Sequence, residues 1–288
     1  MPIEATERDL TVNGLRLHLL EWDGGGPHTL LCLHGFLDLA WSWQAVAPRL
    51  AAAGLHVVAP DLRGHGDSDR VGPGGFYHFM DHVLDAADLA EIVARDQLSL
   101  CGHSMGAMIA SYVAGSFPER VHRLAVLDGF GGRDEPVDLA ARRAADWVQA
   151  VRQARTRAPV AYPTIEAAAA QLREMDPRTS PETALFIAQK GTRLTSAGWV
   201  FKHDPLQLVR SPEPFRFDLA RAFFGAIECP TLLVDAADSE YTRRIPDLAA
   251  RLAAFSGARR VTLREAGHML LRHRPEEVGR LLVDFFTG

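Results

Sequence analysis

The sequence predicts an α/β protein that has a mostly parallel central sheet, helices on both faces of this sheet, and an inserted helical cap. The first observation is a regular alternation of short apolar segments with helix-like segments, which is typical of parallel strands buried on both faces. The second is an interruption of this alternation between residues 135 and 221. The chain has 288 residues, of which 47% are hydrophobic, so it can bury a large core.

The first half of the chain supplies a hairpin and then the regular alternation. Asn13-Gly14 lies between two alternating segments, and Asn-Gly strongly favours a two-residue hairpin turn. The strands that follow are expected at residues 29–33, 56–60, 98–101 and 124–127. The intervening helices are expected at residues 43–53, 79–94 and 105–115.

The segment between residues 135 and 221 contains no stretch of the buried parallel type. It is rich in alanine, arginine and glutamate, with helix-like stretches at 139–155, 165–175 and 181–189 and a short extended piece at 198–201. We therefore expect a helical cap at 135–221, inserted into a core formed by 1–134 and 222–288. In that core, strands are expected at 231–234 and 260–263, and helices at 245–255 and 275–286.

Composition narrows the function classes. The net charge is -5 and no stretch is strongly basic, which argues against a nucleic-acid partner. No apolar run approaches the ~20 residues that span a bilayer, and the first ten residues lack the apolar region of a signal peptide. Cys32, Cys101 and Cys229 lie in or beside apolar runs without ligand spacing, as buried thiols of a reducing compartment do. We expect a cytoplasmic protein with a small-molecule substrate, no cofactor, no metal and no membrane partner; its oligomeric state stays open, a homodimer being one option.

The most informative motif is Gly102-His103-Ser104-Met105-Gly106. It follows the predicted strand at 98–101 and opens the predicted helix at 105–115. A G-x-S-x-G pattern between a strand and a helix is the pattern of a nucleophile elbow, in which a sharp turn exposes the serine hydroxyl. Ser104 is therefore the predicted nucleophile.

A serine nucleophile needs a base and an acid behind the base. His268 is the predicted base, because it follows the last strand and precedes the final helix, in the chain order Ser, acid, His. We favour Asp238 as the acid, because the loop after the strand at 231–234 is expected to lean toward His268. Asp128, at the end of the strand at 124–127, is the alternative acid. Glu240 is weighed as a weaker candidate, and Asp235 is judged too close to the strand.

Two backbone N–H groups are needed to stabilise an oxyanion, each contributing on the order of 3 kcal/mol. One is expected from Met105, directly after the nucleophile, and the other from Phe36, in the loop after the first core strand. His103 and His65 are expected to have structural or pocket roles rather than to act as the base. The predicted pocket residues are His34, Leu37, Trp41, His103 and Trp199.

Together these residues resemble the α/β-hydrolase fold superfamily, over essentially the whole chain. The residues that carry the resemblance are His34-Gly35-Phe36, the segment 61–68, the elbow at Ser104, the segment 117–121 and Gly267-His268. The resemblance implies the α/β-hydrolase fold, with Ser104 as nucleophile, His268 as base, and the amides of Phe36 and Met105 as oxyanion donors.

A narrower likeness is to serine hydrolase-like proteins. It rests on Leu127-Asp128-Gly129 and on the cap segments 162–167, 180–184 and 201–205. The run 234–239 departs from the superfamily pattern, because it lacks a glycine and its ungapped spacing places Ser239 at the position of the acid. Asp238 and Asp128 therefore both remain candidates.

The nucleophile separates reaction classes within this superfamily. Haloalkane dehalogenases and epoxide hydrolases of this fold use an aspartate at the elbow, whereas this chain has Ser104. We therefore expect a serine hydrolase, carboxylesterase-like, that cleaves an ester, thioester or lactone of a small, fairly apolar substrate. The alternative is a non-hydrolytic relative, such as a ligand-binding receptor-like protein or a lyase.

Overall fold

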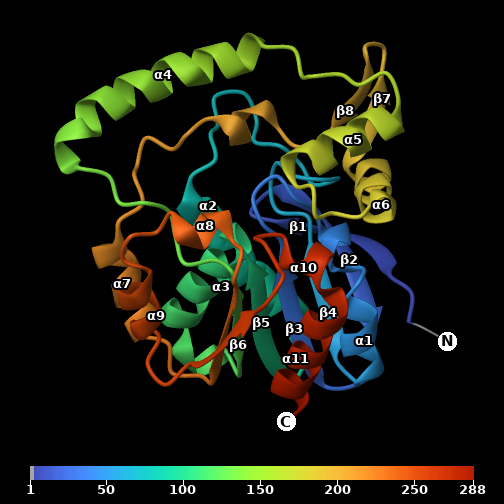
Figure 1. The fold of residues 1–288 in the computed structure, drawn as a ribbon, viewed down its shortest axis with the longest axis vertical. Coiled ribbons are helices and arrows are strands. Elements are labelled where there is room, and N and C mark those ends of the chain that lie inside the picture. Colours follow the sequence, from blue (N-terminus) through green and yellow to red (C-terminus); the bar gives the residue numbers. More distant parts are fainter. Residues whose placement is uncertain (1–2) are drawn as a thin grey trace.

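The computed structural model describes residues 3–288 and contains a central sheet of eight strands (Figure 1). In spatial order the strands are β1 (Thr6–Val12), β2 (Leu15–Asp23), β4 (His56–Pro60), β3 (His28–Leu33), β5 (Gln97–His103), β6 (Leu124–Leu127), β9 (Thr231–Ala236) and β10 (Arg259–Leu263). Strand β2 pairs antiparallel with β1 and β4, and the other pairings in this sheet are parallel. The predicted α/β class with a mostly parallel sheet is confirmed.

The first turn has the backbone that its sequence predicts. Asn13 and Gly14 have φ angles of 50° and 75°. A type I′ hairpin turn requires positive φ at both central positions, which asparagine and glycine adopt most readily. Val12 pairs with Leu15 across this turn, so β1 and β2 form the predicted hairpin.

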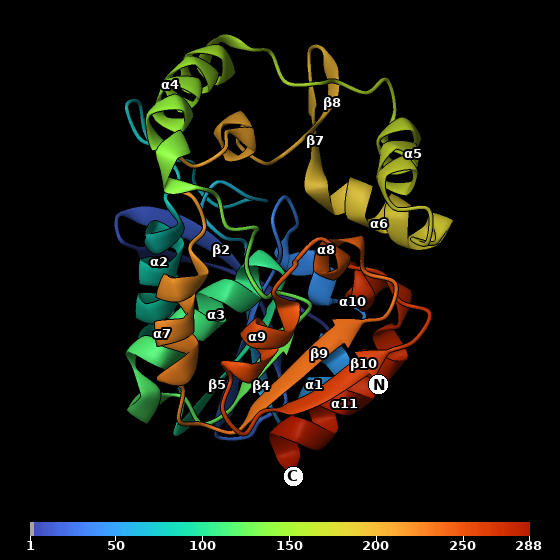
Figure 2. The same cartoon turned by 60° about the vertical axis from the view of Figure 1, so that its left-hand side comes forward.

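Helices cover both faces of the sheet (Figure 2). The side chains of Leu31 and Leu33 pack into one core with α2 (Phe79–Val93), α3 (Met105–Ser116) and α7 (Phe217–Gly225). The side chains of Leu30 and Cys32 pack into the opposite core with α1 (Ala47–Ala52) and α11 (Pro275–Thr287). All four side chains are fully buried. Successive residues of β3 therefore enter two different cores, which is why this strand is a continuous apolar run.

The segment expected to form a cap lies beyond the end of the sheet that also carries α8 (Glu240–Arg243) and α10 (Leu270–His273) (Figures 1 and 2). It contains α4 (Ala140–Thr156), α5 (Ile165–Met175), α6 (Pro181–Gly191), the antiparallel pair β7 (Thr192–Thr195) and β8 (Gly198–Phe201), and the short helices η3 (Val137–Leu139) and η4 (Pro205–Leu208). Thr164 and Ser180 cap α5 and α6 by accepting backbone N–H groups of the first turn. The expected boundary at residue 221 falls inside α7, which packs on α3 through a stacked pair of Phe223 and Tyr112 rings.

The remaining short helices are η1 (Ala40–Trp43), η2 (Pro118–Arg120) and α9 (Leu248–Ala253). Cys32 and Cys101 are buried and Cys229 is half-buried, and all three are free thiols. No helix within residues 3–288 combines the length and the apolar character that a membrane span requires.

Candidate active site

Ser104 lies in a sharp turn between β5 and α3. Its φ angle is 53° and its ψ angle is -116°, a conformation that residues other than glycine rarely adopt. The turn also brings strand and helix very close together. A Cβ atom on Gly102 would lie 2.2 Å from the carbonyl oxygen of Gly106, and a Cβ on Gly106 would lie 2.2 Å from that of Leu33. Both glycines of the motif are therefore required by close backbone approach, and the strained residue between them is the predicted nucleophile.

A hydrogen-bond chain links Ser104, His268 and Asp128. The Oγ of Ser104 lies 2.9 Å from Nε2 of His268, and Nδ1 of His268 lies 2.7 Å from Oδ2 of Asp128. The carboxylate accepts and cannot donate, so Nδ1 carries the proton and donates it to Asp128. In the neutral ring, Nε2 is then left to accept the hydroxyl proton of Ser104. Asp128 is fully buried, whereas His268 and Ser104 are partly exposed.

The carboxylate of Asp128 is fixed by donors other than His268. Its Oδ1 accepts the backbone N–H of Ala236 at 3.2 Å, and its Oδ2 also accepts the hydroxyl of Ser239 at 2.6 Å. Its own N–H donates to the carbonyl of Val234 at 2.7 Å. These bonds hold a buried charge in a single orientation toward the histidine ring.

The expected placement of Asp238 beside His268 is wrong. The carboxylate of Asp238 accepts from Arg178 at 2.9 Å and from Arg243 at 3.4 Å. The backbone explains this: the N–H of Asp238 donates to the carbonyl of Ala266, which holds this loop along the end of β10 and leaves the side chain partly exposed. Asp128 reaches His268 instead because β6 is hydrogen-bonded to β9, so the end of β6 lies beside the same loop.

The other carboxylates weighed for this role have different partners. Asp235 accepts from Arg260 at 2.8 Å, and Glu240 is exposed and pairs with Arg243 at 3.3 Å. Ser239, which ungapped spacing places at the position of the acid, donates its hydroxyl to Asp128. Two features of the sequence together could have identified the acid. Ser239 occupies the position after β9 where a carboxylate is expected, and Asp128 supplies a carboxylate at the end of the neighbouring strand β6.

The amides of Phe36 and Met105 are available to an incoming oxygen. Within residues 3–288, neither N–H donates to another group of the protein. Gly35 lets the loop before Phe36 approach the elbow, because a Cβ there would lie 3.2 Å from Cβ of Ser104. Met105 is the first residue of α3, where the helix dipole adds partial positive charge. Both N–H groups are therefore free to donate, as the donors of an oxyanion hole must be; their role as those donors stays a prediction.

Two aromatic side chains contact His268. His103 donates from Nε2 to the backbone carbonyl of His268 at 2.8 Å, and the two ring centroids lie 5.0 Å apart. Burial, assisted by the neighbouring His268, lowers the pKa of His103 to about 4, so this ring stays neutral near pH 7. The ring of Tyr241 lies 4.7 Å from that of His268, and its hydroxyl donates to the carbonyl of Gly131 at 2.8 Å. No sequence motif identified Tyr241.

The predicted pocket residues divide into two groups. His34 is fully buried and structural: Nδ1 donates to the carbonyl of Gly35, and Nε2 accepts the N–H of Leu62 at 2.9 Å. Leu37 is half-buried, with a φ angle of 57°, and its N–H donates to Nε2 of His65 at 3.2 Å. His34, Leu37 and His103 therefore surround the elbow and the loop at Phe36.

Trp41 contacts the cap instead, and Trp199 is part of it. Trp41 packs edge-on against Phe186 of α6, with the ammonium of Lys190 3.7 Å from the centroid of its ring. Trp199 lies in β8, where its backbone pairs with that of Tyr162. Their role in binding a substrate stays a prediction.

The fold and the site can now be compared with those of known protein families. A model of the α/β hydrolase fold family matches residues 28–274, so the chain belongs to this family. A serine hydrolase-like protein of Dictyostelium discoideum is 29% identical over 215 residues, which cover 71% of this chain and 58% of that protein. Epoxide hydrolase A of Mycobacterium tuberculosis is 35% identical over 122 residues, which cover 42% of this chain and 38% of that one. The chain therefore spans less than two thirds of either relative. Among solved structures, the thioesterase domain from the curacin biosynthetic pathway superposes with a TM-score of 0.86 at 27% identity, covering 99% of both chains.

Proposed function

We propose that the protein is a serine hydrolase that cleaves a carboxylic ester, thioester or lactone of a small, fairly apolar substrate through an acyl-enzyme on Ser104. The hydrogen-bond chain from the Ser104 hydroxyl through His268 to the buried Asp128 carries this proposal. Membership of the α/β hydrolase family supports hydrolysis as the reaction class.

The geometry supports the following sequence of steps. Nε2 of His268 takes the hydroxyl proton as Oγ of Ser104 attacks the carbonyl carbon, and the carbonyl electron pair moves to oxygen. The N–H groups of Phe36 and Met105 stabilise this oxyanion. The oxyanion then collapses, the bond to the leaving alcohol or thiol breaks, and His268 returns the proton to it. Water, deprotonated by the same Nε2, cleaves the acyl-enzyme and regenerates Ser104.

Asp128 acts throughout these steps without giving up its charge. It keeps the proton of neutral His268 on Nδ1 and stabilises the imidazolium that forms when Nε2 takes the second proton. Because its carboxylate is fully buried, this attraction is weakly screened by solvent.

The identity of the nucleophile favours acyl transfer over epoxide opening. A serine oxygen forms an ester with an acyl group, and water can cleave that ester at its carbonyl carbon. Similarity to a thioesterase domain supports a thioester among the substrates.

Labelling with a fluorophosphonate probe tests this proposal. We expect one adduct on Ser104, located by peptide mass spectrometry, and none in Ser104→Ala. A panel of p-nitrophenyl esters, thioesters and lactones of graded chain length then reports turnover, which Ser104→Ala is expected to lower by about 10⁴-fold or more. Unchanged turnover in Ser104→Ala would refute the proposal. A labelled serine without turnover of any member of the panel would favour the non-hydrolytic alternative.

A further inference from the structure

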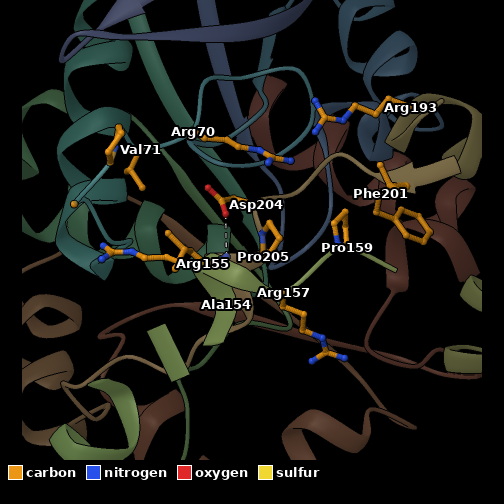
Figure 3. A pocket seen from close by; sticks show the side chains of 15 residues that line it. Arg70, Val71, Ala154, Arg155, Arg157, Pro159, Arg193, Phe201, Asp204 and Pro205 are labelled. Carbon is orange, nitrogen blue, oxygen red and sulfur yellow. Dashed lines mark hydrogen bonds between the residues drawn. The ribbon is translucent and has the colours of Figure 1, made fainter. Parts of the chain in front are cut away.

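A cavity of about 660 Å³ lies between the cap and the loop that follows β4 (Figure 3). Its volume is that of a small-molecule binding site. Four arginines line it: Arg70 from the loop after β4, Arg155 and Arg157 at the end of α4, and Arg193 from β7. They come from three separate parts of the chain, and no sequence motif joins them.

These arginines lack carboxylate partners. Within residues 3–288, none of the four forms an ion pair with an aspartate or glutamate. Arg70 donates to the backbone carbonyl of Lys202 at 3.0 Å, and Arg155 donates to that of Gly75 at 3.2 Å. No hydrogen bond of the Arg157 or Arg193 side chain occurs in the same part of the chain. The guanidinium N–H groups of Arg157 and Arg193 are therefore free to bind a ligand.

One carboxylate also lines the cavity, and its oxygens are occupied. Asp204 accepts the hydroxyl of Tyr77 at 2.8 Å and the N–H of Leu206 at 2.9 Å. The four exposed arginines and the one aspartate that line this cavity carry a formal charge of three positive units, in a protein whose net charge is -5. An accumulation of this size favours a multiply charged anion over a single carboxylate.

The arrangement of the lining suits an organic anion. Arg70 and Arg193 extend toward one another in the view of Figure 3, from the loop after β4 and from β7, whereas the side chains of Arg155 and Arg157 extend away from this pair. Apolar walls stand beside them, formed by Val71, Pro159 and Phe201. Guanidinium groups present paired donors that match phosphate oxygens, and apolar walls bury the uncharged part of a ligand.

The loop after β4 contacts both a wall of the cavity and the loop that carries Phe36. The N–H of Asp204 donates to the carbonyl of Gly64 at 2.8 Å. The next residue, His65, accepts the N–H of Leu37, which directly follows Phe36. A wall of the cavity and the loop of the oxyanion donor thus rest on the same segment.

We propose that this cavity binds the phosphate groups of an organic phosphate, and that the substrate is an acyl ester or thioester whose leaving group carries those phosphates. This adds an anionic part to the fairly apolar acyl group expected from the sequence. Binding of the anion is independent of the chemistry at Ser104, whereas its assignment to the substrate rests on the proposed function.

Binding is tested first, with the double variant Arg70→Gln/Arg193→Gln. The matched control is Arg152→Gln/Arg259→Gln, two exposed arginines outside the cavity whose loss changes the net charge equally. Inorganic pyrophosphate and adenosine 3′,5′-bisphosphate are titrated calorimetrically into each protein at low salt. We expect the cavity variant to raise Kd about ten-fold and the control to change it less than two-fold, with unfolding midpoints confirming that both variants are folded. No binding to the unmodified protein, or equal weakening in both variants, would overturn the site.

Assignment to the substrate is tested with two thioesters of the same acyl group. Hexanoyl-coenzyme A carries phosphates, and hexanoyl-N-acetylcysteamine carries none. We expect the unmodified protein to prefer the first by about ten-fold in kcat/KM, the control to keep this ratio, and the cavity variant to lose most of it. Hydrolysis of both thioesters without preference would overturn the assignment while leaving the proposed function standing, even if pyrophosphate alone binds. Hydrolysis of neither would count against the proposed function, and the titration would still decide whether the cavity binds phosphate.

Discussion

Replacing Asp128 by asparagine changes one side-chain oxygen to an NH₂ group and leaves the volume at the site unchanged. The new group has two orientations. At the Oδ1 position it would face the N–H of Ala236, which is a donor and cannot adapt. At the Oδ2 position it would face Ser239 and His268, both of which can accept instead of donate. The second orientation is therefore favoured, and it draws the proton of His268 from Nδ1 to Nε2.

In that tautomer Nε2 cannot take the proton of Ser104, and the developing imidazolium has lost its carboxylate. The loss expected for this change is about 10⁴-fold in kcat, which corresponds to about 5 kcal/mol of transition-state stabilisation. The matched variant is Asp238→Asn, which weakens only the partly exposed ion pairs with Arg178 and Arg243. Such pairs contribute about 0–1 kcal/mol to stability, so kcat is expected to stay within about two-fold.

The assay is the steady-state hydrolysis of p-nitrophenyl butyrate by both variants and the unmodified protein, with the unfolding midpoint of each as a check on folding. Circular dichroism should show no change in secondary structure for either substitution. If Asp238→Asn loses activity and Asp128→Asn keeps it, the assignment of the acid from the hydrogen-bond geometry is refuted.

Three further predictions follow from contacts around this site. Gly35→Ala places a Cβ 3.0 Å from Nδ1 of His103 and 3.2 Å from Cβ of Ser104. We expect this contact to shift the loop that carries Phe36 and to lower kcat by about 10²-fold. A kcat within two-fold of the unmodified protein would contradict this. Tyr241→Phe removes the hydroxyl that donates to the carbonyl of Gly131 and accepts the N–H of Phe130. We expect the free energy of unfolding in urea to fall by about 1–3 kcal/mol, and an unchanged value would count against a structural role for these bonds. Burial lowers the pKa of His82 to about 3 in the folded protein. Between that pH and the ordinary pKa of histidine, His82 takes up a proton in the unfolded chain but not in the folded protein. The free energy of unfolding therefore falls as the pH is lowered through this range. In urea titrations between pH 7 and pH 4, we expect His82→Gln to reduce this slope by up to about 1.4 kcal/mol per pH unit, and a slope equal to that of the unmodified protein would refute it.

The fold and two members of the site could be predicted because short-range sequence determines them. The turn at Ser104 needs glycine two residues before and two residues after it, and the close backbone contacts at Gly102 and Gly106 show why no other residue fits. His268 follows the last strand, where chain order alone places it at the correct edge of the sheet. The strands read as continuous apolar runs because their successive side chains enter two cores.

The acid could not be predicted in the same way, because its position depends on a pairing between strands. Asp128 and Asp238 both follow strands that end at the same edge, and β6 and β9 are neighbours in the sheet. Which carboxylate faces His268 is decided by backbone bonds that no local pattern encodes: the N–H of Asp128 donates to Val234, whereas that of Asp238 donates to Ala266. The first bond directs a carboxylate inward, toward the ring, and the second holds its loop against the neighbouring strand end, with the side chain outward.

The arginine-lined cavity could not be predicted from the sequence, for a related reason. Arg70, Arg155 and Arg193 are far apart in the chain and lie in a loop, at a helix end and in a short strand. Each of these arginines taken alone is typical of an exposed position, and the net charge of -5 does not indicate a basic site. Folding of the cap over the loop after β4 creates the accumulation of charge. The chemistry proposed for Ser104 thus rests on a motif that the sequence shows, whereas the proposed anion site rests on side chains that only the packing of cap against core brings together.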